Sequence, residues 1–163
     1  MTWQGKLVHI HIAPAASYEM EELAEAQLIA GRGIVGDRYY LGTGTYSPKP
    51  DVRDITLIEI EVLEAIAKGE PKIPGFKALL APENHRRNLT TRGVPLSHLL
   101  GTRFRVGETI LRAARMNFPC KYIEELLGIP GLYEGLLNRS GLNCEIEVGG
   151  VIRLSDPILP IDE

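Results

Sequence analysis

One thiol, Cys120, is the residue of this sequence to which chemistry is most readily assigned. It follows Pro119 directly and precedes the stretch 121–128, whose apolar spacing and final glycine predict a short helix. A thiol at the start of a helix lies beside unpaired backbone N–H groups, which stabilise the nucleophilic and metal-binding thiolate. Lys121, and Arg115 if the fold brings it near, would favour the same form. Cys120 is therefore predicted to be a nucleophile or a metal ligand, and a small buried hydrophobic residue is the alternative.

For the second thiol, Cys144, we predict the opposite, a packed and unreactive side chain. It lies in the alternating segment 142–148, which is typical of a strand, where a side chain is packed rather than reactive. Two cysteines do not make a disulfide framework, so we expect two separate free thiols.

A dense basic cluster lies at 82–93, in a chain whose formal net charge is -3. It holds three arginines, and the planar guanidinium fork suits carboxylate or phosphate. If 87–91 is a strand, alternation places Arg86 and Asn88 on one face and Arg87 on the other. We predict Arg86 and Asn88 to be anion-binding residues, with a solvated charged face as the alternative.

The glycines of 31–36 match the GxGxxG pattern of dinucleotide-binding proteins. That pattern requires a helix to begin there, and the residues that follow cannot continue a helix well. We interpret the glycines as a tight turn that projects Asp37 and Arg38, which could also form a purely local ion pair.

For two further sets of candidate functional residues, a purely structural role is a strong alternative. His9 and His11 share one face of the alternating segment 6–12 and could hold a metal ion, but two ligands alone are a weak signal and we favour a partly exposed polar face. Arg139 follows a short helix predicted at 132–138, where the helix dipole alone would favour a cation.

The pattern of elements favours a mainly β fold with short helices. The 17 glycines and 11 prolines, spread along the chain, interrupt the elements often and favour a barrel-like or strongly bent β architecture over a doubly wound parallel sheet. The loop 41–53 is long enough to cover a functional site. The segment 19–30 could form either a helix or a strand. The predicted strands and helices are a strand at 6–12, a strand at 55–58 running into a helix that Gly69 ends, a helical turn at 96–100, a hairpin of 103–106 and 109–114, and strands at 142–148 and 151–154, the last of the chain.

Length and composition predict one globular domain, residues 1–163, with 44% hydrophobic residues to build its core. The negative net charge argues against nucleic acid and anionic membranes as partners. The sequence has no leader-like start and no apolar run that could span a bilayer, so we expect a cytoplasmic protein.

Five blocks of the sequence, taken in order and spacing, resemble the MOSC family, named for the C-terminal domain of molybdenum cofactor sulfurase. They are GIVGDRY at 33–39, ENHRRNLTTRGV at 83–94, RFRVGE at 103–108, the step Pro119-Cys120, and GLLNRSGLNCEIEVGGVIRLSD at 135–156. The resemblance implies a β-barrel similar to the β-barrel domain of pyruvate kinase. It also implies that Cys120 carries sulfur as a persulfide or, in members that bind molybdenum cofactor, ligates molybdenum.

The same resemblance implies that Arg86 and Asn88 contact the phosphate region of the pterin. Asp37, Arg38 and Arg139 lie in the matching blocks and join them as candidate cofactor-binding residues.

The leading functional hypothesis is a sulfur-carrier or molybdenum-cofactor-handling protein that delivers sulfur from Cys120 to a metal or cofactor acceptor. We expect a pyridoxal-phosphate-dependent cysteine desulfurase as the donor and no pyridoxal phosphate on this chain. One alternative is a molybdenum-cofactor-dependent reductase of N-hydroxylated compounds. The other is a non-catalytic module that binds an anion, with Cys120 buried.

Overall fold

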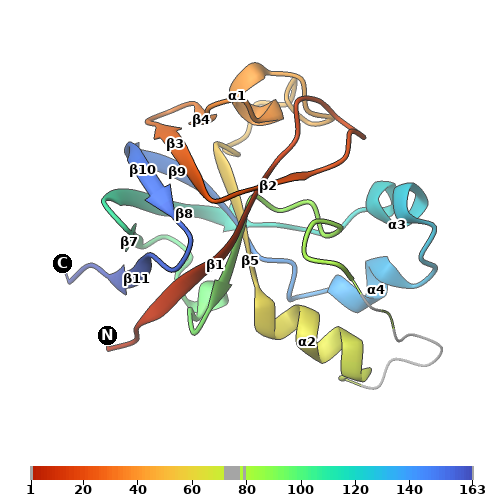
Figure 1. The fold of residues 1–163 in the computed structure, drawn as a ribbon. Coiled ribbons are helices and arrows are strands. Elements are labelled where there is room, and N and C mark those ends of the chain that lie inside the picture. Colours follow the sequence, from red (N-terminus) through yellow and green to blue (C-terminus); the bar gives the residue numbers. More distant parts are fainter. Residues whose placement is uncertain (1, 72–77, 79, 163) are drawn as a thin grey trace.

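The computed structural model describes residues 2–71, 78 and 80–162, and its fold is mainly β (Figure 1). The strands are β1 Gly5–Ile12, β2 Glu21–Leu23, β3 Glu25–Ile29, β4 Gly33–Ile34, β5 Ile55–Glu59, β6 Leu89–Arg92, β7 Arg103–Val106, β8 Thr109–Met116, β9 Leu142–Val148, β10 Gly150–Arg153 and β11 Pro157–Pro160. The helices are α1 Arg38–Leu41, α2 Ile60–Lys68, α3 Lys121–Leu127 and α4 Leu132–Leu136, with a 3-10 turn at Leu96–His98.

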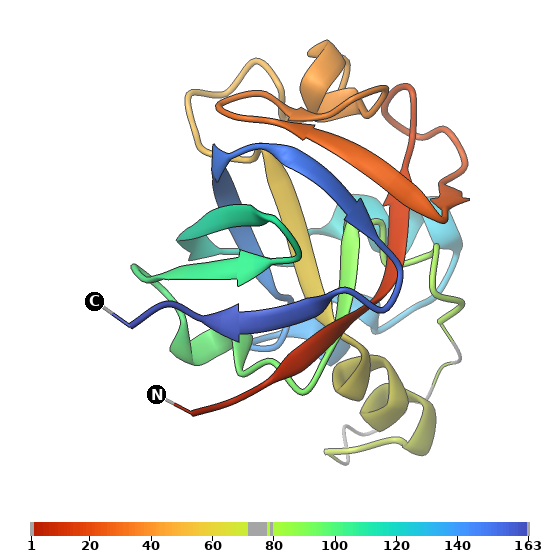
Figure 2. The same cartoon turned by 60° about the vertical axis from the view of Figure 1, so that its left-hand side comes forward.

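Seven of the described strands close into a barrel, in the order β11-β7-β8-β9-β5-β6-β1. The closing pair is β1 with β11, which lie side by side at the two ends of the chain (Figure 2). The two strands are antiparallel, with Gly5 opposite Ile158. Of the described pairs, β5 and β6 run parallel, which makes the barrel mixed. Strand β2 extends the sheet beyond β1, and β10, β3 and β4 form a separate small sheet. The expected mainly β, barrel-like fold with short helices is therefore confirmed.

The barrel interior is an apolar core, and its residues show that β1 does not alternate strictly between its two faces. Strict alternation would place Leu7 and Ile10 on opposite faces, yet both are buried in the same cluster. The pairing of β1 with β6 shifts register between Leu7 and His9, which indicates a β-bulge. A bulge adds one residue to a strand and so reverses the alternation beyond it.

A second apolar cluster joins helices α2, α3 and α4 on one side of the barrel (Figure 1). Val62 and Ile66 of α2 pack there with Ile123 of α3 and Leu136 of α4. This cluster fixes α3 against the barrel, and with it the residue that precedes α3, Cys120. Among the described helices, none has the length and apolar character needed to cross a membrane.

Two elements differ from the sequence-based expectation, and one segment that the sequence left open is decided. The ambiguous segment 19–30 forms strands β2 and β3. The strand predicted at 151–154 is not the last, because β11 follows it and closes the barrel despite a proline at each end. The residues after the glycine turn, expected to be non-helical, form the short helix α1, since the side chain of Asp37 caps it by accepting from the backbone N–H of Tyr39.

Candidate functional site

A cavity of about 390 Å³ lies where Cys120, the basic cluster and the loop 42–54 meet. A volume of this size is in the range of small-molecule and cofactor sites. Its lining includes six cationic side chains, namely Arg38, Lys49, Arg53, Arg86, Arg87 and Arg115. Asp51 is the one carboxylate among the described lining residues, and it is shared by Arg53 and Arg115. The cavity is thus strongly positive and suited to an anion.

Cys120 occupies the N-cap position of α3, as its sequence context predicts. Its backbone is extended, with φ -138° and ψ 159°, and its side chain makes no capping hydrogen bond to the helix. The half-buried Sγ instead accepts a hydrogen bond from Tyr46 Oη at 3.0 Å. The preceding Pro119 is buried and Phe118 is 72% exposed, so the thiol lies just inside the protein surface.

Tyr46, which the sequence did not single out, is the closest polar partner described for Cys120. Its hydrogen bond to Cys120 and, secondarily, its burial raise the pKa of the phenol to about 12. Tyr46 therefore stays protonated at neutral pH and acts as the donor. Its one sequence signal is its place in the long loop that was expected to cover a site.

Arg38 enters the cavity from α1 and is held by the turn before it. Its Nη1 donates to Asp37 Oδ1 at 3.0 Å, and both side chains are buried. The same carboxylate accepts from the backbone N–H groups of Ala13 and Tyr39. The predicted Asp37–Arg38 pair is present, with Arg38 lining the cavity and Asp37 outside the lining, orienting it.

Arg86 and Arg87 both line the cavity, which corrects the expectation that they face opposite sides. Alternation does not apply to them because β6 begins only at Leu89 and Arg86 has a positive φ of 65°. The Arg86 guanidinium donates to the carbonyl oxygen of Tyr18 at 2.6 Å.

Arg87 is a buried cation with neutral partners. Its guanidinium donates to the carbonyl oxygens of His85 and Ser140, to the hydroxyl of Ser140 and to Asn117 Oδ1. Among the described residues no carboxylate pairs with it. Burial lowers its pKa to about 10, and the nearby Tyr39 and Cys120 oppose that shift. The positive charge of Arg87 is thus uncompensated and lies close to the thiol.

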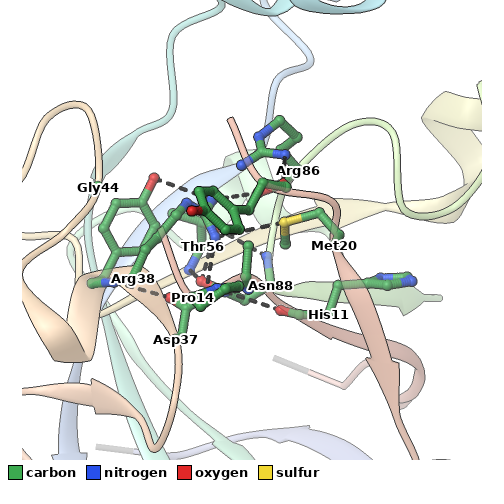
Figure 3. Close-up of polar contacts among 12 residues, drawn as sticks. His11, Pro14, Met20, Asp37, Arg38, Gly44, Thr56, Arg86 and Asn88 are labelled. Carbon is green, nitrogen blue, oxygen red and sulfur yellow. Dashed lines mark hydrogen bonds and ion pairs between the residues drawn. The ribbon is translucent and has the colours of Figure 1, made fainter. Parts of the chain in front are cut away.

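Asn88 and Arg139, two other predicted binding residues, are not among those that line this cavity. Asn88 is fully buried between strands, where its Oδ1 accepts from the backbone N–H and the hydroxyl of Thr56 and its Nδ2 donates to His11 O (Figure 3). Arg139 Nε donates to Gly135 O, one turn back in α4. In this structure Asn88 ties strands together and Arg139 caps a helix.

The histidine pair shares a face as predicted, with the ring centroids of His9 and His11 5.6 Å apart. His9 Nδ1 bonds Glu22 at 2.5 Å, whereas His11 is 1% exposed and burial lowers its pKa. Within 2–71, 78 and 80–162, no group of three or more His, Cys, Asp or Glu side chains is arranged to hold a metal ion. The described side chains thus give the pair no third ligand.

Cys144 is fully buried on β9, and burial raises its pKa well above the usual range of a thiol. The two cysteines are free rather than paired, as expected. Cys120 is therefore the thiol available for chemistry.

Comparison with known proteins agrees with this fold. The structure is similar to that of the YuaD protein from Bacillus subtilis, with a TM-score of 0.77, 22% identity, and coverage of 96% of this chain and 97% of that one. It is also similar to YiiM from Escherichia coli, with a TM-score of 0.67, 18% identity and coverage of 97% and 70%. YiiM from Geobacillus stearothermophilus gives a TM-score of 0.71 at 12% identity, with coverage of 97% and 75%. At these identities the likeness shows the fold.

Comparison with curated proteins gives no match. The MOSC domain family matches residues 50–159, which is more than half of the chain and includes the basic cluster and Cys120. That family is associated with molybdenum cofactor. The chain therefore belongs to the MOSC domain family.

Proposed function

We propose that this protein carries sulfur on Cys120 as a persulfide and delivers it to a metal or cofactor acceptor. Its MOSC membership supports a molybdenum-cofactor-related role in general, and the sulfur-carrier function is the specific form proposed. A pyridoxal-phosphate-dependent cysteine desulfurase is the proposed donor. The acceptor's anionic group binds to the cationic lining, chiefly Arg38, Arg86 and Arg87.

The observation that carries the proposal is the buried, uncompensated Arg87 in the same cavity as Cys120. A buried charge without a counter-charge is costly, so the site gains stability when an anion binds there. The thiolate and persulfide forms of Cys120 are anions, as is a phosphate-bearing acceptor. The cavity thus favours the binding of an anionic acceptor next to Cys120.

The loading step is balanced without an added oxidant. The Cys120 thiolate attacks the terminal sulfur of the donor's persulfide, and a new S–S bond forms at Cys120 Sγ. The S–S bond within the donor breaks, and the donor cysteine leaves as a thiolate. One sulfane sulfur moves between two cysteines and no net oxidation occurs.

A cyanolysis assay tests the proposal. The protein is incubated with a cysteine desulfurase and cysteine and separated from both, and the sulfane sulfur that cyanide releases from it is measured. We expect close to one sulfur per chain for wild type and for Cys144→Ala, and none for Cys120→Ser. Equal release from wild type and Cys120→Ser, or none from either, would contradict it.

Reduction of N-hydroxylated compounds with molybdenum cofactor is the second candidate, favoured by the combination of a thiol and several arginines in one cavity. The described side chains fit that group: Cys120 would ligate molybdenum, and Arg38, Arg86 and Arg87 would hold the phosphate of the pterin. When bound, the cofactor would supply the two-electron chemistry.

Metal analysis tests the second candidate. The protein is produced in a cofactor-competent host, and molybdenum is quantified in wild type and Cys120→Ser. Stoichiometric molybdenum in wild type that is lost in Cys120→Ser would support the reductase, and metal-free wild type would count against it.

A further inference from the structure

We infer that a second cavity binds an organic cation, a guanidinium or ammonium group on an apolar stem. This acidic cavity has a volume of about 590 Å³, and its lining comes from β1, the segment 17–22, the segment 83–86 and the end of α3. Of the described residues, Arg86 alone lines both this cavity and the one that holds Cys120. The inference concerns a separate site and does not depend on the proposed sulfur transfer.

The charge of the lining is negative. Three carboxylates, Glu19, Glu22 and Glu83, line the acidic cavity, against the one guanidinium of Arg86. Glu22 bonds the ring of His9. Within the described part of the chain, Glu19 and Glu83 have no ion pair. These two carboxylates are therefore available to a cation, and hydrogen bonds between charged groups are the strong ones.

His11 is a second and independent sign of a ligand. Its side chain is 1% exposed and lines the acidic cavity, and among the described residues its Nδ1 has no hydrogen-bond partner. Figure 3 shows its ring pointing away from Asn88, which bonds the backbone of the same residue. A buried polar atom without a partner costs stability, and a ligand that carries N–H groups removes that cost.

The surroundings of His11 suit a cation. Burial lowers the pKa of its imidazole, so the ring is neutral at pH 7 and does not repel a positive charge. The carboxylates of Glu22 and Glu83 act on the ring electrostatically, which places them near it. Imidazole and carboxylates together therefore offer several acceptors to one cationic group.

The walls of the acidic cavity are tied to one another. Arg86 Nη1 donates to the carbonyl oxygen of Tyr18, with 2.6 Å between the two atoms. Ser17 Oγ and Tyr122 Oη are hydrogen-bonded at 2.5 Å, which joins the segment 17–22 to α3. Because these contacts hold the walls in place, a ligand does not have to order them when it binds.

Apolar side chains complete the lining and indicate which kind of cation fits. Leu126 and Leu127 at the end of α3 line the cavity together with Met20. Such walls pack against a hydrocarbon stem, so they favour an organic cation over a bare metal ion. A guanidinium is the best match, because its N–H groups diverge in one plane and reach more than one acceptor.

Titration with N-butylguanidinium, followed by the NMR chemical shifts of the backbone amides, tests the inference. N-butylurea is the control ligand, since it has nearly the same shape and no charge. The proteins are wild type, Glu83→Gln, His11→Phe and Glu125→Gln. Glu125 is the matched control, because it is exposed on α3 and does not line the acidic cavity. Thermal melting establishes that each variant is folded.

We expect wild type to bind N-butylguanidinium about tenfold more tightly than N-butylurea, because the urea lacks the charge. Glu83→Gln and His11→Phe should each weaken binding of the cation by about fivefold, and Glu125→Gln should keep the wild-type affinity. The absence of saturable binding, equal affinity for the two ligands, or an unchanged affinity in folded Glu83→Gln or His11→Phe would overturn the inference.

A second titration distinguishes the sources of the cation. A capped tripeptide with arginine between two glycines is compared with N-butylguanidinium. Binding of N-butylguanidinium alone would assign the cavity to a free small molecule, and binding of both would show that an arginine side chain of another protein also fits. Both results support a cation site.

The titration uses no sulfur donor and no cofactor, so its failure is distinct from failure of the proposed function. Cys120→Ser should bind N-butylguanidinium as wild type does, since Cys120 does not line the acidic cavity. Loss of binding in that variant would show that the cation occupies the Cys120 cavity and would overturn the inference.

Discussion

The guanidinium of Arg38 donates a hydrogen bond to the backbone carbonyl of Arg86, with 2.8 Å between Nη2 and the oxygen (Figure 3). This contact joins two sequence blocks, 33–39 and 83–94, that lie far apart in the chain. The accepting carbonyl belongs to a residue with a left-handed backbone, and both arginines line the same cavity. Disturbing either block should therefore disturb the anion site as a whole.

Asp37→Ala should lower the free energy of unfolding by about 3–5 kcal/mol, because it leaves the buried Arg38 without its carboxylate and removes the cap of α1. Urea unfolding measures the loss. Glu25→Ala is the matched control, since it removes an exposed ion pair with Arg153 and should cost less than about 1 kcal/mol. Equal losses in the two variants would show that Asp37 does not hold Arg38.

Asn88→Ala should destabilise the barrel by about 2–4 kcal/mol, because the buried backbone N–H and hydroxyl of Thr56 lose their acceptor. Alkylation of Cys120 in the folded variant should keep its wild-type rate, since Asn88 does not line the cavity. A stable variant with altered Cys120 reactivity would instead assign Asn88 to the site.

Stability should fall as the pH is lowered below about 6.5, in part through His85. Burial and the charge of Arg87 lower the pKa of His85 well below 6.5, and its Nδ1 accepts from the backbone N–H of Arg87. The unfolded chain therefore binds more protons than the folded chain between those two values, which makes folding less favourable as pH falls, by up to about 1.4 kcal/mol per pH unit.

Unfolding free energies at several pH values below 7 measure this dependence. His85→Gln should show a shallower decline than wild type, and the exposed His98→Gln should match wild type. If the free energy of unfolding declines with pH at the same slope in all three proteins, protonation of His85 is excluded as a source of the pH dependence.

One thiol should react in the folded protein and two in denaturant. Cys144 is fully buried with a raised pKa, whereas Cys120 lies half-buried at a cavity. Titration with a chromogenic disulfide reagent counts the reactive thiols, and Cys120→Ser should show none until it unfolds. Reaction of Cys144 at the native rate of Cys120 would contradict this assignment.

Local sequence signals predicted the elements that local interactions form. Helix α3 with Cys120 at its cap and the β7–β8 hairpin follow from spacing and glycine placement, and both are present. Other features depend on contacts between distant residues. Tyr46 lies 74 residues from Cys120, in a loop without periodicity, so no local pattern could pair them. Closure by β11 likewise depends on pairing between the two ends of the barrel sequence.

The basic cluster at 82–93 shows a second limit of prediction from sequence patterns. Alternation would separate Arg86 from Arg87 only if both were in a strand, and a positive φ at Arg86 breaks that condition. Backbone conformation of this kind is fixed by tertiary contacts such as the Arg38 bond, which a pattern of side-chain types does not contain.

Intact-mass spectrometry after incubation with a cysteine desulfurase and cysteine tests the central claim, that Cys120 accepts sulfur, most directly. Wild type and Cys144→Ala should gain the mass of one sulfur atom, the gain should vanish on reduction, and Cys120→Ser should gain nothing. A reductant-sensitive gain on Cys120→Ser, or no gain on wild type with an active donor, would contradict the account.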